Sequence, residues 1–329
     1  LDRGCADGVV HGVLPAKGIA GDQGARPLNT QGRNTGLIGL MPMVFVLIWS
    51  TGFIVARYGM PNSPPFKFLV VRYALSIICF IPWILLAGVK WPRTGAQWRH
   101  LGITGLLMHA GYLGGVWAAV KAGMGSGLAA LIVGLQPILT AIWLSLFSLT
   151  AQTGRVTRRQ WVGLLLGFLG LLLVVSRKFG QGAPGDSANL VNLAFALSAL
   201  LSITAGTLYQ KRFVESCDVR TANTVQLGAA LLVSLPLALV ESDSMRWNLE
   251  LVGAMAWSVL GLTIGGSSLL FLLIQRGAAA TVASLMYLVP PTTAVIAWLL
   301  FGEPITVVTV FGVLLTATGV SLVMRTPGK

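Results

Sequence analysis

Few polar side chains lie inside the long apolar stretches of this chain, and two of them are close together. His109 and Tyr112 occur three residues apart in the stretch LLMHAGYLGG, so a helix would place both on one face. Imidazole is the side chain that titrates near neutral pH, and a phenol can donate a hydrogen bond. The pair could therefore contact a bound solute or carry a proton. Alternatively, His109 is a hydrogen-bonded residue of the packed core.

Aromatic residues and one amide are the other candidates for contact with a small molecule. Tryptophan and tyrosine rings could line a cavity for apolar or ring-bearing solutes, or they could pack in the core or at the membrane interface. Gln136, which precedes Pro137, could donate a hydrogen bond to a solute. The candidate substrate-binding residues are Trp49, His109, Tyr112, Trp117, Gln136, Trp143 and Tyr287.

Charged residues are scarce in the apolar stretches. Arg72 is the one strong charge inside a stretch, where it could contact an anionic group. We expect instead a structural arginine near the interface that pairs with carbonyl groups. Glu303, just before Pro304, is expected to fix a turn rather than to bind substrate. No Asp or Glu lies in the middle of a stretch, which argues against a proton relay or a cation pump built on a buried acid.

Signatures of catalysis are absent from the sequence. It has no Walker, HExxH, CxxC or GxSxG motif, and therefore no ATP-hydrolysing site of its own and no recognisable enzyme centre. Its three cysteines, Cys5, Cys79 and Cys217, are far apart and indicate neither a disulfide framework nor a metal site. We expect no catalytic residue, no metal and no cofactor.

The composition indicates a membrane protein. Hydrophobic residues make up 55% of the 329 residues and charged residues only 10%, with a mean hydropathy of +0.79, whereas a soluble domain carries about 25% charged residues. Continuous apolarity favours helices over a barrel, whose strands would alternate. We expect an all-α integral membrane protein with ten transmembrane helices. They are predicted at 36–56, 66–88, 99–119, 125–148, 160–176, 189–210, 222–240, 252–274, 281–301 and 305–324.

The cations between these stretches predict the orientation. With the N-terminus inside, 16 Lys and Arg residues fall on the inner side and 6 on the outer side. This bias places both termini in the cytoplasm. The net charge of +13 comes from Lys and Arg residues that lie in the short gaps between apolar stretches. A nucleic-acid partner would require these residues to be clustered on one face, so we expect none. Residues 1–35 are Gly-rich and polar, and we expect them to form a disordered cytoplasmic tail.

The second half of the chain repeats the first at a shift of 154 positions. The aligned residues include Pro82 with Pro236, Pro137 with Pro291, and Arg72 with Gln226. After the fourth stretch the shift becomes 149 and pairs glycines, Gly163 with Gly312 and Gly170 with Gly319. Small residues at such positions allow close contact between membrane helices.

The repeat predicts the domain organisation. Residues 36–177 and 189–325 form two five-helix repeats, joined by the linker 178–188. Because each repeat has an odd number of spans, the two copies must be inverted, with a site near the midplane between them. Prolines inside membrane helices free a carbonyl that protein, water or solute must satisfy. Pro137, Pro290 and Pro291 are therefore predicted to bend helices, beside the cavity or through packing alone.

Several stretches together resemble the drug/metabolite transporter superfamily, and in particular its EamA family of metabolite exporters. The matching segments are LIWSTGFIVARYG, VVRYALSIICFIPWIL, GLAALIVGLQPILTAIW, RRQWVGLLLGFLGLLLV and TVASLMYLVPPTTAVIAWLLFGEPITVVTVFGVLLTATGV. The resemblance covers 36–325. It implies a ten-helix exporter of small metabolites or drugs in the bacterial inner membrane. One departure concerns the Gly-Glu turn common to both halves of the family, because Leu149 stands at the repeat equivalent of Glu303.

The sequence therefore favours a secondary transporter that exports amino acids or related amphipathic compounds by alternating access. Its partners would be a small-molecule substrate and the lipid bilayer, and the chain would act as a monomer or a dimer. A proton-coupled drug or multidrug exporter is the alternative within the same class. A channel would need a ring of polar groups, and a membrane-embedded enzyme would need a cluster of His, Asp or Cys that this chain lacks.

Overall fold

A computed structural model describes residues 35–147, 158–179, 186–266, 268–269 and 288–324. The chain divides into two units, residues 1–39 and residues 40–329. Apart from the first turn of the first helix, every element below belongs to the second unit. Tyr287, one of the candidate substrate-binding residues, lies outside the described residues.

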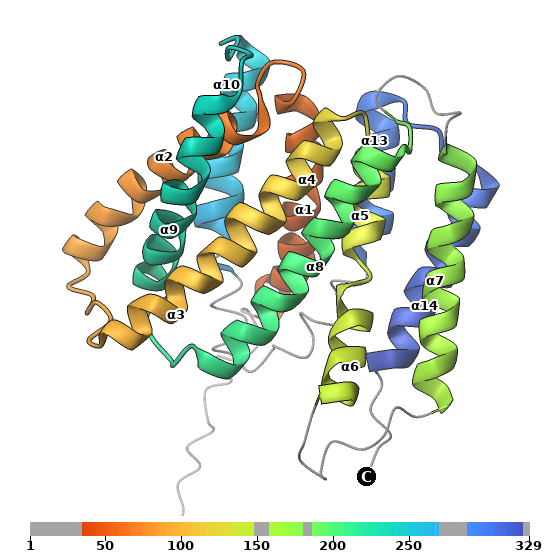
Figure 1. The fold of residues 1–329 in the computed structure, drawn as a ribbon, viewed down its shortest axis with the longest axis horizontal. Coiled ribbons are helices and arrows are strands. Elements are labelled where there is room, and N and C mark those ends of the chain that lie inside the picture. The colour runs from red at the N-terminus through yellow and green to blue at the C-terminus, as the bar shows by residue number, and fades with distance from the viewer. Residues whose placement is uncertain (1–34, 148–157, 180–185, 267, 270–287, 325–329) are drawn as a thin grey trace, which may run out of the picture. The chain divides into compact units, whose positions relative to one another are not determined.

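The described residues are helical, with a single isolated β-bridge between Phe179 and Ala188. The helices are α1 (Thr35–Gly59), α2 (Pro65–Leu86), α3 (Gly95–Gly105), η2 (Leu106–Gly111), α4 (Tyr112–Lys121), α5 (Ser126–Val133), α6 (Gln136–Phe147), α7 (Arg158–Lys178), α8 (Leu190–Phe213), α9 (Val219–Val240), α10 (Leu249–Ala256), η3 (Trp257–Gly266), α13 (Val289–Phe301) and α14 (Val307–Met324). Figure 1 shows their arrangement.

The membrane spans fall where the apolar stretches predict them. Five helical segments are long and apolar enough to cross a bilayer: 65–86, 95–121, 190–213, 219–240 and 249–266. Five shorter apolar helices lie at 43–59, 126–140, 161–177, 289–301 and 307–322. Each of these ten segments overlaps one predicted stretch, which confirms the ten-helix, all-α prediction for the part of the chain that the structure describes.

Local sequence determines where several helices begin. Asn189 accepts a hydrogen bond from the backbone N of Asn192 at 2.9 Å, and the Asn192 side chain reciprocates, which closes a capping box at the start of α8. Asn248 accepts from Leu251 N at 2.8 Å at the start of α10. Pro65 occupies the first turn of α2, where its missing N–H costs no helical hydrogen bond.

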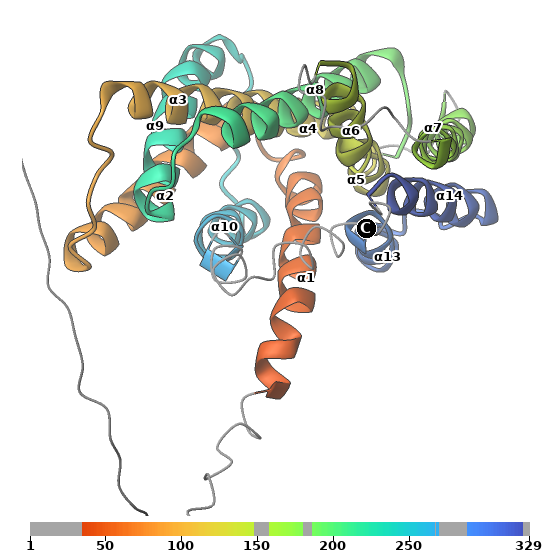
Figure 2. The ribbon, with the colours of Figure 1, turned by 90° about the horizontal axis from the view of Figure 1, so that it is seen from below.

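Helices of the two repeats pack against one another. The repeat-equivalent helices α2 and α9 are in contact, as are α7 and α14, and α5 of the first repeat contacts α13 of the second. The two views of Figures 1 and 2 agree that α7 and α14 run side by side. Contact between equivalent helices is expected when two copies are related by an approximate two-fold axis.

The seam between α7 and α14 is built on the predicted glycines. A Cβ atom added to Gly170 would lie 2.5 Å from the carbonyl oxygen of Gly312, and one added to Gly319 would lie 2.4 Å from that of Gly163. Real Cβ atoms essentially never come so close to another atom. The backbones of the two helices therefore touch only because these positions lack side chains, as predicted.

Pro137, Pro290 and Pro291 stand in the first turn of a helix, whereas Pro82 and Pro236 lie inside α2 and α9. The fourth span breaks at Gly134, so that α5 ends and α6 starts one residue before Pro137. Pro290 and Pro291 stand in the first turn of α13, where proline is well tolerated, and the preceding part of the predicted span lies outside the described residues. A Cβ on Gly134 would lie 2.9 Å from Pro290 Cγ, so the two proline sites pack against each other.

Candidate functional site

A central cavity of about 120 Å³ lies between helices of both repeats. The first repeat contributes α1, α2, η2 and α4, and the second contributes α8 and η3. Apolar and aromatic groups make up most of its wall. The lining residues are Trp49, Gly52, Phe53, Arg72, Met108, His109, Tyr112, Leu113, Val116, Trp117, Ile203, Leu262 and Thr263.

Three pairs of lining residues are related by the internal repeat. Each pair is separated by the 154 positions that align the two halves: Trp49 with Ile203, Met108 with Leu262, and His109 with Thr263. At these three positions both copies contribute to the cavity wall, but with different side chains. The other seven lining residues come from the first repeat alone.

The third helix of each repeat has a π-helical segment at this level. In the first repeat η2 carries Met108 and His109, and in the second η3 carries Leu262 and Thr263. Within η3, Thr263 Oγ1 donates a hydrogen bond to the carbonyl oxygen of Ser258, five residues earlier, at 2.9 Å. A π-helical turn replaces the regular α-helical ladder and is frequent at functional sites. Here it occurs twice, at repeat-equivalent positions beside one cavity.

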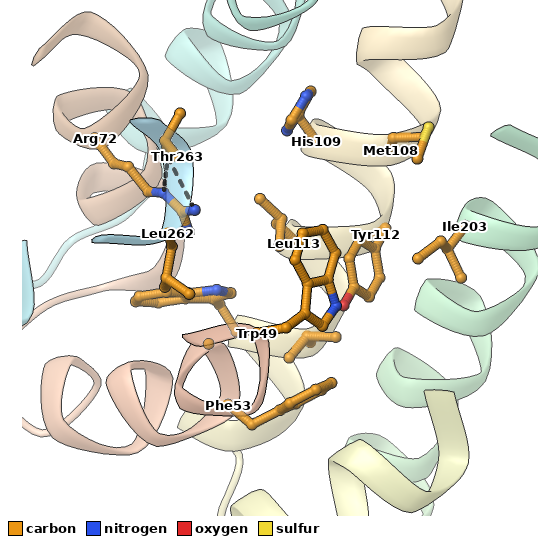
Figure 3. Close-up of a pocket in the computed structure, with 13 residues that line it drawn as sticks. Trp49, Phe53, Arg72, Met108, His109, Tyr112, Leu113, Ile203, Leu262 and Thr263 are labelled. Carbon is orange, nitrogen blue, oxygen red and sulfur yellow. Dashed lines mark hydrogen bonds between the residues drawn. The ribbon is translucent and has the colours of Figure 1, made fainter. Parts of the chain in front are cut away.

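Arg72 extends from α2 to the wall of this cavity. Its Nε and Nη2 atoms lie 3.4 and 3.2 Å from Oγ1 of Thr263. Figure 3 shows this pair on one side of the cavity, with His109 and Tyr112 on the other. The arginine side chain is buried, and only 7% of it is exposed. The hydrogen-bond partner of Arg72 is therefore a hydroxyl group and not the carbonyl groups that we expected.

His109 is held by groups from two neighbouring helices. Its carbonyl oxygen accepts a hydrogen bond from Tyr73 Oη at 2.9 Å, and the Tyr73 ring meets the imidazole edge-on at 6.1 Å. The side chain of Gln226 lies against the imidazole. Gln226 is the repeat equivalent of Arg72, so the pairs Arg72–Thr263 and Gln226–His109 are symmetric counterparts.

The aromatic part of the wall is well packed. Trp117 is 1% exposed and stacks on Phe68 with ring centroids 4.3 Å apart. Trp49 packs against Phe45 at 5.3 Å. Together with Tyr112 these rings give the cavity rigid apolar surfaces, which suit a ring or a branched alkyl group. The four predicted residues that the structure brings together here are Trp49, His109, Tyr112 and Trp117.

Two other predicted substrate residues do not line this cavity. The Gln136 side chain donates to Thr207 Oγ1 at 2.9 Å and so ties α6 to α8. Trp143 lies farther along α6 and is 52% exposed. Gln136 was predicted from its position beside Pro137, and Trp143 from its aromatic side chain. Neither feature by itself determines the direction in which a side chain points.

Glu303 binds the other repeat rather than its own turn. Its Oε1 accepts hydrogen bonds from the backbone N and the Oγ of Ser126, both at 3.0 Å, and its Oε2 accepts from Gly127 N at 3.3 Å. These groups form the start of α5, so the carboxylate caps that helix and complements its dipole. The turn after α13 is instead closed by Gly302, at a φ of +65° that favours glycine.

A second glutamate of the second repeat acts in the same way on the first. Glu241 accepts hydrogen bonds from the backbone N of Phe66 at 2.9 Å and of Lys67 at 2.8 Å, at the start of α2. Lys121, at the end of α4, donates to Met60 O at 2.9 Å between the two capped helices. Carboxylates from the second repeat thus fasten two helix starts of the first repeat at one end of the bundle.

Eight lining residues were not singled out in the sequence: Gly52, Phe53, Met108, Leu113, Val116, Ile203, Leu262 and Thr263. Residue type gave no signal for them, because such residues are ordinary in a membrane helix. The internal repeat, however, did give a signal for two of them. Applying the shift of 154 to the predicted Trp49 and His109 leads directly to Ile203 and Thr263.

Comparison with known proteins gives relatives of similar length. A protein of Salmonella typhimurium named "Probable amino-acid metabolite efflux pump" is 24% identical over 292 residues, which cover 85% of this chain and 92% of that protein. The "Uncharacterized inner membrane transporter YedA" of Escherichia coli K12 is 25% identical over 271 residues, covering 81% and 84%. One solved structure superposes with a TM-score of 0.59 at 19% identity, covering 87% of this chain and 96% of that one.

The family model described as "EamA-like transporter family" matches this chain twice, at residues 36–176 and 191–325. The two matches coincide with the two copies of the internal repeat. The solved structure supports the same fold, and the named relatives are transporters. The chain is therefore a multi-pass membrane transporter and belongs to the EamA-like transporter family.

Proposed function

We propose that this protein is a secondary transporter that exports small organic metabolites, such as amino acids or related amphipathic compounds. The observation that carries the proposal is the central cavity, which both repeats line with equivalent positions. A site on the axis between two inverted repeats can open to either side as the halves rock. Its volume of about 120 Å³ suits a small solute better than a drug-sized molecule.

The moving bodies in this proposal are the repeats 36–177 and 189–325, joined by the linker 178–188 and preceded by a cytoplasmic tail, 1–35. The chain lies in the bacterial inner membrane with both termini in the cytoplasm, because Lys and Arg are concentrated on that side. It works as a monomer or a dimer, without nucleic acid, cofactor or catalytic step. Thiol labelling of single cysteines in the loops, from each side of the membrane, tests the orientation.

Counterflow in proteoliposomes tests the transport itself. Vesicles that contain the purified protein are loaded with one unlabelled compound and then exposed to traces of labelled amino acids, amines, organic acids and sugar phosphates. Exchange of any of these solutes supports a carrier, whereas a channel gives net flux without exchange. The absence of exchange for every solute refutes the proposal. A pH gradient in a parallel series decides whether proton movement accompanies transport.

A substitution in the cavity tests where the solute binds. Tyr112 lines the cavity, so Tyr112→Ala should change the order of preference among solutes while leaving the protein folded. Tyr209→Ala is the matched control, because Tyr209 packs against His100 at a centroid distance of 5.7 Å and does not line the cavity. Equal effects of the two substitutions on solute preference would place the binding site elsewhere.

A further inference from the structure

Arg72 is the unusual feature of the cavity. It is a buried guanidinium that, among the described residues, donates hydrogen bonds to one neutral hydroxyl, that of Thr263. A guanidinium has five N–H donors and keeps its charge in proteins. Most buried charges are neutralised by an opposite charge, because an isolated charge in a low-dielectric interior costs several kcal/mol. In the described residues, no carboxylate lies within ion-pair distance of Arg72.

The chain has no acidic residue with which to neutralise Arg72 inside the membrane. Three of its ten Asp and Glu residues belong to the segment 1–34, and the other seven lie in connecting segments or at helix ends. Several of these seven are already engaged: Glu241 and Glu303 accept from helix starts, Asp218 pairs with Arg220 at 2.9 Å, and Glu250 accepts from Asn62 at 3.1 Å. The ten apolar segments themselves hold no acid in their middle.

The remaining wall of the cavity specifies the rest of the ligand. Apart from Arg72, its polar side chains are those of Thr263, His109 and Tyr112 and the indoles of Trp49 and Trp117. Nothing in the lining offers a negative charge to an ammonium group. The aromatic and aliphatic side chains opposite Arg72 instead present an apolar surface to whatever the guanidinium holds (Figure 3).

We propose that Arg72 anchors the carboxylate of an organic acid with an apolar body, and that the amino group of an amino acid is dispensable for binding. This inference rests on the proposed transport function and names the class of its substrate. The carboxylate supplies the negative charge that the chain lacks, and a guanidinium can bind it through two parallel hydrogen bonds. Thr263 positions the guanidinium, and the rings of α1 and α4 enclose the apolar body.

A matched series of ligands tests the charge requirement without any substitution. The series is 3-phenylpropanoate, phenylalanine, 2-phenylethylamine and 3-phenyl-1-propanol, together with the isobutyl acid 4-methylpentanoate. Binding is measured as the rise in the melting temperature of the purified full-length protein in detergent, which reports affinity for the folded state. The acids and phenylalanine should stabilise the protein, and the amine and the alcohol should not. Stabilisation by the amine or the alcohol equal to that by the acid overturns the inference, as does the absence of stabilisation by every acid.

Variants test whether Arg72 is the anchor. Arg72→Gln should weaken binding of the acids by roughly 10- to 100-fold, the loss expected for a charged hydrogen bond, and the alcohol should stabilise neither this variant nor the wild type. Arg72→Lys should retain part of the preference for acids, because it keeps the charge. Arg99→Gln, which removes an exposed arginine from α3, is the matched control and should bind as the wild type does. If Arg72→Gln does not fold, Thr263→Val provides the second test, with a smaller loss of acid affinity and no change for the alcohol.

Counterflow with the same series separates this inference from the proposed function. Acids that bind but are never exchanged would refute transport and leave the anchor in place. Exchange of the amine and the alcohol as fast as of the acids would refute the anchor and leave transport in place. Unchanged acid affinity in a folded Arg72→Gln variant would also refute the anchor.

Discussion

The glycine seam between α7 and α14 makes a quantitative prediction about the fold. In Gly170→Ala the new methyl group would lie 2.5 Å from the carbonyl oxygen of Gly312 and 2.6 Å from Oγ1 of Thr316. The first of these atoms belongs to a backbone and cannot rotate away. Relief to about 3.4 Å, where ordinary contact begins, requires the two helices to move apart by about 1 Å.

The cost of this movement follows from the behaviour of overpacked interiors. Inserting a methyl group where no space exists typically costs about 1–3 kcal/mol, against which alanine gains about 0.5–1 kcal/mol over glycine in a helix. Gly228→Ala in α9 is the matched control, since a Cβ there meets nothing within 4 Å. Gly228→Ala should gain the stability that alanine has over glycine in a helix, without the steric clash. Gly170→Ala should therefore be less stable than the control by about 1–3 kcal/mol.

Thermal unfolding of the two purified variants in the same detergent measures this difference. With about 2–4 °C for each kcal/mol, the midpoint of Gly170→Ala should lie roughly 2–12 °C below that of Gly228→Ala. Gly312→Ala, which meets the carbonyl of Gly170 at 2.7 Å, should behave like Gly170→Ala. Equal midpoints for Gly170→Ala and Gly228→Ala would refute the close contact of the two helices.

Three further predictions concern polar contacts outside the cavity. Glu303→Gln removes the charge that caps α5 and should destabilise the protein by about 1–2 kcal/mol in thermal unfolding; an unchanged midpoint would contradict the cap. The hydrogen bond from the Arg220 side chain lowers the pKa of the Asp218 carboxyl. The Asp218–Arg220 pair therefore stabilises the protein, by at most about 1 kcal/mol, at pH values above the ordinary pKa of an aspartate. This stabilisation is lost as the pH falls through the lowered pKa of Asp218. Melting curves between about pH 7 and pH 3 should show less loss of stability in Asp218→Asn than in the wild type. Thr207→Val removes the hydroxyl that accepts the hydrogen bond of the Gln136 amide and should lower the melting midpoint. The affinity for 3-phenylpropanoate should not change, because neither residue lines the cavity.

The sequence was sufficient for the arrangement of the spans because lipid imposes a simple requirement. A helix must present about 20 apolar residues to cross the hydrocarbon core, so the ten stretches could be read from hydropathy alone. Short connections, such as the one between α1 and α2, leave the ends little freedom. The glycines of α7 and α14 were also predictable, because the repeat aligned them and few residues other than glycine allow such close contact.

The site was less predictable because it depends on directions rather than on residue types. Trp143 and Trp117 look alike in the sequence, but one is 52% exposed on α6 and the other is 1% exposed beside the cavity. Arg72 stands near the start of a span, which favoured the interface, yet α2 directs it inward to Thr263. The rotation of a helix about its own axis is determined by packing against neighbouring helices. Hydropathy does not predict this rotation for residues near the ends of a span.

The two repeats match in backbone but differ in charge at the contacts that matter for movement. Glu241 and Glu303 both belong to the second repeat, and their equivalents in the first, Ala87 and Leu149, cannot cap a helix start. If the halves exchange conformations as proposed, the state that separates Glu303 from α5 loses hydrogen bonds to a charged group, at about 1.5–3 kcal/mol each, and gains no counterpart at the opposite end. A bound ligand shifts such an equilibrium only by its difference in affinity for the two states. In the proposed mechanism these one-sided caps therefore contribute to the free-energy gap between the two states, and a solute that binds Arg72 would shift the equilibrium between them.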